Sequence, residues 1–154
     1  MNMRKFKTLG GIPIDSIVDY IKEYISTHDN IDILIGTDSQ SRGKETVYAT
    51  VIVLYTRGRG GHVLVSKKIT PKERVIPVKL LNEVWMSVEV AEFLKENDVP
   101  KPRYIDVDLN PDPRWASNKV LRDAVGLVEG MGYSVRYKHN GAMSTYAADH
   151  VVKH

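Results

Sequence analysis

Three strand-like runs follow one another without a helix between them, and this order constrains the fold more than any other feature of the sequence. The run at 31–38 is apolar and β-branched, and the runs at 45–56 and 62–70 are separated only by the glycine-rich, basic segment RGRGG. Consecutive strands joined by short turns pair antiparallel as hairpins. The sequence therefore predicts a three-stranded antiparallel meander with a basic tip.

After these three runs the pattern changes to alternating helices and strands. Apolar residues recur at helical spacing through 78–98 and 117–132, and strand-like runs follow at 103–109 and 133–139. A helical pattern around 14–27 precedes the meander, and a short one closes the chain. Strands joined through a crossover helix in one sheet run parallel. We therefore expect an α/β domain with a mixed five-stranded sheet, three antiparallel strands and then helix-connected parallel strands, flanked by helices.

Composition limits the functions that are open to such a chain. With 154 residues, of which 42% are hydrophobic, it has the size and composition of one ordinary globular domain, which we expect to span 1–154. The absence of cysteine removes disulfides, thiolate metal sites and a cysteine nucleophile. No apolar run approaches the roughly 20 residues of a membrane-spanning helix. Because the basic start also lacks the apolar stretch of a secretory signal, we expect a cytoplasmic protein without a membrane partner.

Aspartates stand where two strands of the predicted sheet would end. Asp38 closes the first strand-like run, and Asp108 closes the run at 103–109. Ligands of open α/β sheets bind beyond the carboxyl ends of the strands, so these carboxylates converge if the two strands are parallel neighbours. Alternation places Asp106 on the same face as Asp108. Because a buried carboxylate without a partner is costly, we expect a positive group nearby.

Two further acids lie near the same edge if the helices form as predicted. The stripe of Glu83 becomes apolar toward Leu94, which puts this carboxylate at the inward side of the long helix, whereas the later glutamates share a solvated face. Asp149 precedes two valines in the closing helix and is near enough to the helix start to face the sheet edge. The four acids that could then meet in one site are Asp38, Glu83, Asp108 and Asp149.

These segments resemble a known family. The element order and the motifs IGTDSQ, VDLNP and YAADHVV resemble the ribonuclease H-like superfamily and, within it, the YkuK-type (DUF458) branch of bacterial proteins. The resemblance covers nearly the whole chain from Ile31 onward. The acids that it implies for the first strand, the long helix, the fourth strand and the last helix are Asp38, Glu83, Asp108 and Asp149. Two positions depart from the pattern, since His139 replaces an expected proline and Asp106 stands where histidine is more usual.

Clustered carboxylates without cysteine suit hard cations such as Mg²⁺ or Mn²⁺. Two such ions, about 3.5–4 Å apart, can hold a phosphodiester between them, so that one activates the attacking water and the other stabilises the leaving 3′-oxygen. We therefore predict a metal-dependent nuclease with two ions, in which Asp38 bridges both ions and the other acids complete their shells. Without metal the like charges repel, and at least one acid should have a raised pKa.

Other polar residues are candidates for supporting the site or for binding nucleic acid. Those that could support the metal site or assist protonation are Asp106, Ser39, Asn110, Lys138 and His150. The net charge of +3 suits a polyanionic partner. The cations that could follow a phosphate backbone include Arg57, Arg59, Arg114, Lys119, Arg136 and Lys138. A solvated charge distribution would look similar, and the scattered histidines, His62 among them, are interpreted as solvated.

Two other functions remain open from the sequence. A ribonuclease H-like fold could bind nucleic acid or protein without cutting it, although no acid is missing. IDVDLN also resembles the aspartate-x-aspartate loop of haloacid dehalogenase-like phosphatases, with Asp106 as nucleophile and Asp108 as acid/base. Too little chain follows that loop for the rest of such a fold, and GTDSQ would have no role. The substrate could be an RNA–DNA hybrid or structured DNA such as a junction, and junction cutting would require a homodimer.

Overall fold

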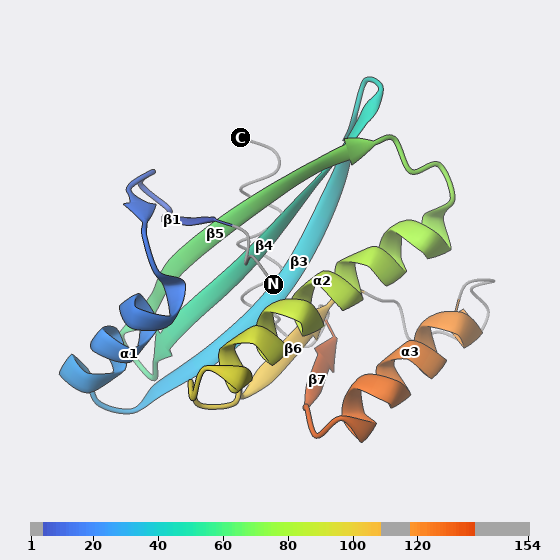
Figure 1. The fold of residues 1–154 in the computed structure, drawn as a ribbon. Coiled ribbons are helices and arrows are strands. Elements are labelled where there is room, and N and C mark those ends of the chain that lie inside the picture. Colours follow the sequence, from blue (N-terminus) through green and yellow to red (C-terminus); the bar gives the residue numbers. More distant parts are fainter. Residues whose placement is uncertain (1–4, 109–117, 138–154) are drawn as a thin grey trace.

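The computed structural model describes residues 5–108 and 118–137, which form a mixed sheet with helices packed against it (Figure 1). The strands are β1 (Phe6–Thr8), β2 (Pro13–Ile14), β3 (Ile31–Arg42), β4 (Glu45–Thr56), β5 (Gly60–Pro71), β6 (Tyr104–Val107) and β7 (Val135–Tyr137). The helices are α1 (Ile17–Thr27), α2 (Ile76–Glu96) and α3 (Asn118–Gly130). The order of the strands across the sheet is β2-β1-β5-β4-β3-β6-β7.

The predicted antiparallel meander is confirmed in β3, β4 and β5, which have 12 residues each. Pairing between β3 and β4 runs from Ile31 opposite Thr56 to Arg42 opposite Glu45, and β4 pairs with β5 along its whole length. The basic segment forms the β4–β5 tip, where Gly58 has a φ of 80° that glycine adopts without steric cost. The meander forms the long, curved centre of the sheet in Figure 1.

The helix-connected strands are parallel, as predicted. Strand β6 pairs with β3 from Leu34 opposite Tyr104 to Gly36 opposite Asp106. Strand β7 pairs with the other edge of β6, also in parallel. Helix α2 makes the connection from β5 to β6, and α3 makes the one from β6 to β7. This topology places β3 at the junction of the antiparallel and parallel halves of the sheet.

The beginning of the chain differs from the prediction. The sheet has seven strands rather than five, because β1 pairs with β5 and β2 pairs with β1. Strands of 3 and 2 residues are too short for alternation to be recognised in the sequence. The first helix begins at Ile17 rather than near Ile14, because the Ser16 hydroxyl caps it by accepting a hydrogen bond from the Asp19 N–H at 3.2 Å.

The prediction that the first strand of the meander ends at Asp38 is wrong. Strand β3 continues to Arg42, because β4 pairs with it up to the turn at Gly43. On its other edge, pairing with β6 stops at Gly36. At Asp38, β3 is therefore paired with β4 but no longer with β6.

The two faces of the sheet carry separate apolar clusters, because successive side chains of a strand point in opposite directions. The strand residues in the larger cluster, which packs against α1, α2 and α3, include Ile33, Ile35, Ile52, Leu54, Leu64 and Ile105. The buried residues of the cluster on the other face are Leu34, Val47, Ala49, Val51, Val53 and Val65. Burial on both faces explains why β4 is an almost unbroken apolar run. Across the described ranges, no helix combines the length and apolarity needed to cross a membrane.

Candidate metal centre

Three carboxylates from three elements meet beyond the end of β6. Asp38 belongs to β3, Glu83 to the N-terminal half of α2, and Asp108 directly follows β6. One carboxylate oxygen from each residue lies within 4.8 Å of the others. The strand register brings the two aspartates together, because Gly36 lies opposite Asp106 and the aspartates follow two residues later on neighbouring parallel strands. We call Asp38, Glu83 and Asp108 the acid triad.

The acid triad is shielded from solvent and linked by one serine. Asp38 and Glu83 are each only 5% exposed, and Asp108 is half-buried. The Ser39 hydroxyl donates a hydrogen bond to the Glu83 carboxylate, while the Ser39 backbone N–H donates to Asp38 Oδ1 at 2.9 Å. Successive side chains of a strand point to opposite faces, so Ser39 and Asp38 lie on opposite faces of β3. Ser39 points to the face that α2 covers, where it meets Glu83. Ser39 thus orients two acids at once.

Helix α2 is held over β3 by buried hydroxyl groups. The oxygens of Thr37 and Ser87 lie 2.8 Å apart, and those of Thr37 and Thr50 lie 3.0 Å apart. Ser87 is one helical turn after Glu83, so these bonds set the position of α2 at the level of the acid triad. The apolar stripe predicted behind Glu83 is confirmed, since the later residues on that stripe are buried.

Burial raises the pKa of Glu83 well above its ordinary value, although the Ser39 hydrogen bond lowers it in part. The negative charges of Asp38 and Asp108 raise the pKa further. A raised pKa was expected from repulsion among the acids, but desolvation is the larger cause. A bound cation would compensate both effects, because it replaces the lost hydration and neutralises the charges.

The raised pKa of Glu83 predicts how stability depends on pH without metal. Above pH 4.5, its ordinary pKa, Glu83 of the unfolded chain loses its proton while the folded protein keeps it. The folded state then binds more protons, so this group makes the free energy of unfolding fall as pH rises, until the folded pKa is passed. Glu83→Gln cannot titrate and should become progressively more stable than the natural protein. Denaturant unfolding in EDTA from pH 4.5 to neutral pH measures this difference, and parallel pH curves would contradict it.

Asp106 points to the same face as the two triad aspartates but has a structural partner. It is 1% exposed, and its carboxylate accepts two hydrogen bonds from Arg136 of β7, from Nε at 2.8 Å and from Nη2 at 3.0 Å. The guanidinium also lies 4.8 Å from the centre of the Tyr104 ring. The positive group expected near the buried acids is therefore Arg136. Its guanidinium binds Asp106, although the sequence had suggested that it contacts a phosphate backbone. A carboxylate held in this way is poorly placed to attack a substrate, which argues against the phosphatase interpretation.

The remaining predicted site residues are spread over the chain. Those that lie outside the described residues are Asp149, Asn110, Arg114, Lys138 and His150. Arg57 and Arg59 are in the β4–β5 tip, at the opposite end of the meander from the acid triad. Lys119 is exposed on α3, where its Nζ lies 3.7 Å from Asp123 Oδ2. The structure thus brings three of the four predicted acids together and places Arg57 and Arg59 far along the meander from them.

Two contributions to the site were missed from the sequence. The bond between Ser87 and Thr37 was not expected, because a serine in a helical stripe looks like any small residue. Arg136 was assigned to the surface, although it is the residue opposite Asp106 in the parallel register. A buried acid in one central strand and a cation in the next strand would have been the signal for that ion pair.

A mixed sheet in which an antiparallel meander continues into parallel strands, with carboxylates where the two halves join, defines the ribonuclease H-like class of protein. The family comparison agrees with this class. The chain belongs to the family described as Ribonuclease H-like, the YkuK-type (DUF458) family, whose model matches residues 14–153. No curated protein and no solved structure matches the chain. The family and the buried acid triad fit a nuclease-type module in which a metal ion could be bound.

Proposed function

We propose that the protein is a metal-dependent nuclease that hydrolyses phosphodiester bonds in nucleic acid by a two-metal-ion mechanism. The observation that carries the proposal is the acid triad, whose carboxylate oxygens lie within 4.8 Å of one another in a shielded site. Three such groups without a cation would be strongly unfavourable if all were charged. An oxygen-only donor set fits a hard cation, and we propose Mg²⁺ or Mn²⁺.

Each acid has a distinct role in this proposal. Asp38, on β3 where the two halves of the sheet join, would hold both ions, while Glu83 and Asp108 would each hold one of them. Asp149, outside the described residues, is proposed as the fourth ligand. When bound, the ions supply an activated water and stabilise the leaving 3′-oxygen. Glu83 must release its proton to act as a ligand, so metal binding should be weaker at lower pH.

Other residues position the acids or bind the substrate. Ser39 orients Asp38 and Glu83, and Asp106 joins β6 to β7 through Arg136. The supporting residues proposed outside the described ranges are Asn110, Lys138 and His150. The cations proposed to contact the phosphate backbone are Arg57, Arg59, Arg114, Lys119 and Lys138. The substrate we propose is an RNA–DNA hybrid or a structured DNA such as a junction, and a homodimer is the form that would cut a junction symmetrically.

Cleavage of a labelled panel tests the proposed function. The panel holds an RNA–DNA hybrid, a DNA duplex, single strands and a four-way junction, each incubated with Mg²⁺, with Mn²⁺ or with EDTA. We expect cutting of at least one member with metal and none in EDTA. The same panel measured for binding provides the control. Binding of a member without cutting under any metal condition would overturn the nuclease and favour a non-catalytic nucleic-acid-binding module.

A further inference from the structure

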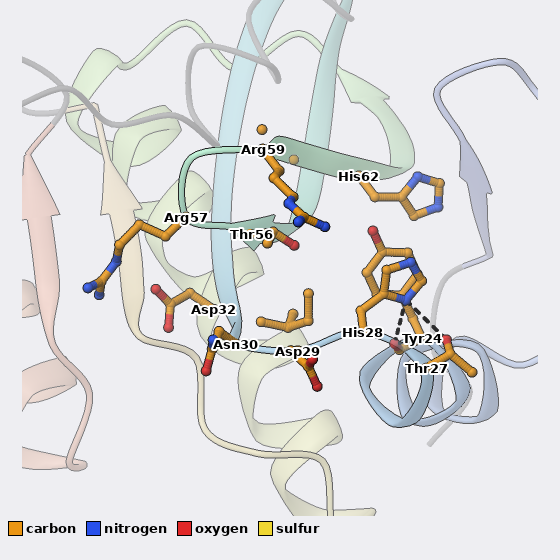
Figure 2. Close-up of a pocket in the computed structure, with 13 residues that line it drawn as sticks. Tyr24, Thr27, His28, Asp29, Asn30, Asp32, Thr56, Arg57, Arg59 and His62 are labelled. Carbon is orange, nitrogen blue, oxygen red and sulfur yellow. Dashed lines mark hydrogen bonds between the residues drawn. The ribbon is translucent and has the colours of Figure 1, made fainter.

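A cavity of about 930 Å³ lies at the other end of the meander from the acid triad. It is lined by the end of α1, the start of β3 and the β4–β5 tip (Figure 2). The side chains that matter for its chemistry are Tyr24, His28, Asp29, Arg57, Arg59 and His62. Asp32, which also lines the cavity, is six positions before Asp38 on β3, so at about 3.3 Å per residue the cavity lies about 20 Å from the acid triad.

Stacked rings form one wall of this cavity. Tyr24 is parallel to His28, with ring centres 3.9 Å apart, and to His62, with ring centres 5.1 Å apart. The Tyr20 hydroxyl lies 2.6 Å from Nε2 of His62. Nδ1 of His28 lies 2.9 Å from the carbonyl oxygen of Tyr24, and because a carbonyl can only accept, this nitrogen carries the hydrogen. The ring of His28 is therefore held in place before any ligand arrives.

The cations of the cavity come from the β4–β5 tip. Arg57 and Arg59 are exposed, and neither has an ion pair within residues 5–108 and 118–137. Figure 2 shows the guanidinium of Arg59 reaching over the cavity toward the stacked rings, while Arg57 extends on the side of Asp32. Asp32 lies 3.6 Å from Arg103, which compensates part of its charge, and Asp29 is the other acid of the lining. The cations at the mouth of the cavity are thus available to an anionic ligand.

We propose that this cavity binds a backbone phosphate of the nucleic acid, with Arg59 and Arg57 supplying the positive charge and the hydrogen-bond donors. The choice of a nucleic acid as the ligand rests on the proposed function. Guanidinium groups suit phosphate oxygens, because their planar donors match the geometry of the anion. At about 3.4 Å per nucleotide, a separation of about 20 Å corresponds to roughly six nucleotides of a duplex strand. The cavity would then anchor the substrate at a set distance from the cleavage site.

Salt-dependent binding tests the proposal without requiring cleavage. The probe is a fluorescent duplex of about 20 base pairs, made both as DNA and as RNA–DNA hybrid, which is long enough to span both sites at about 3.4 Å per pair. Binding is measured in EDTA for the natural chain, for Arg57→Gln/Arg59→Gln, and for the matched variant Lys22→Gln/Lys95→Gln. The matched variant removes the same charge from exposed helix positions that do not line the cavity.

We expect the arginine variant to weaken binding of the tighter probe about tenfold at low salt. The slope of log K against log salt should become shallower by about 1, because the contact with one backbone phosphate is lost. The lysine variant should keep the natural slope.

Two results would overturn this inference. One is an equal loss of affinity in the arginine and lysine variants, which would show that only net charge matters. The other is binding of AMP or inorganic phosphate that depends on the arginines while duplex binding does not, which would assign the cavity to a free phosphorylated molecule. Failure of the nuclease proposal is distinguishable, because it would appear as absent cleavage in the metal panel while the arginine-dependent binding in EDTA persists.

Discussion

Asp38→Asn should reduce metal-dependent cleavage by at least about 10²–10³-fold, which corresponds to about 3–4 kcal/mol of lost transition-state stabilisation. The reason is the position of Asp38 on β3, where one of its carboxylate oxygens lies within 4.8 Å of an oxygen of Glu83 and of Asp108. An amide keeps the size of the side chain but loses the negative charge that a bridging ligand must supply. Single-turnover cleavage of the substrate identified in the panel, with saturating metal, measures the effect.

The same variant separates loss of chemistry from loss of folding. Removing one negative charge from beside Glu83 relieves repulsion, so without metal Asp38→Asn should be at least as stable as the natural protein. Asp123→Asn is the matched control, because it makes the same change at an exposed position on α3. The control should cleave normally. Cleavage by Asp38→Asn at the natural rate would contradict the assignment of Asp38 as a metal ligand.

Arg136→Met should lower the free energy of unfolding by about 3–5 kcal/mol, the usual cost of breaking a buried ion pair by removing one partner. Asp106 is 1% exposed and receives two hydrogen bonds from Arg136, so the substitution leaves a buried carboxylate without its cation. Methionine keeps much of the volume of the arginine stem, which limits the contribution of lost packing. Denaturant unfolding at neutral pH measures the change.

Two further variants show whether the buried charge is the cause. Lys119→Met breaks an ion pair whose side chains are 90% and 71% exposed, and its effect should stay within about 0.5 kcal/mol. Asp106→Leu/Arg136→Met replaces both charges with apolar side chains and should recover most of the lost stability, because no buried charge remains unpaired. An Arg136→Met effect as small as that of Lys119→Met would contradict the proposed role of this ion pair.

The order of the main elements could be predicted from the sequence because each leaves a local pattern. The β-branched runs of β3, β4 and β5 and the helical spacing in α2 and α3 depend only on residues close in the chain. Strands β1 and β2 are too short for a pattern, and the extension of β3 beyond Asp38 depends on its partner strand. The missed features are therefore those that pairing with a distant segment creates.

The members of the acid triad were predicted, but their meeting was not determined by the sequence. Asp38 and Asp108 were identified by their positions at strand ends, and Glu83 by a stripe that turns apolar. Whether their oxygens meet depends on the register of β3 against β6 and on the docking of α2 through Ser87. These contacts join segments far apart in the chain, and no local pattern records their register.

The sequence by itself determined the alternation of strands and helices, the oxygen-only choice of ligands, and the family to which the chain belongs. Only the tertiary structure decided that Asp106 pairs with Arg136 while Asp38 and Asp108 face Glu83, and that His28 and His62 stack on Tyr24 beside the basic tip. The physical reason is the range of the interactions. Propensity and periodicity act between neighbours in the chain, whereas ion pairs, ring stacks and metal sites are set by packing between distant elements.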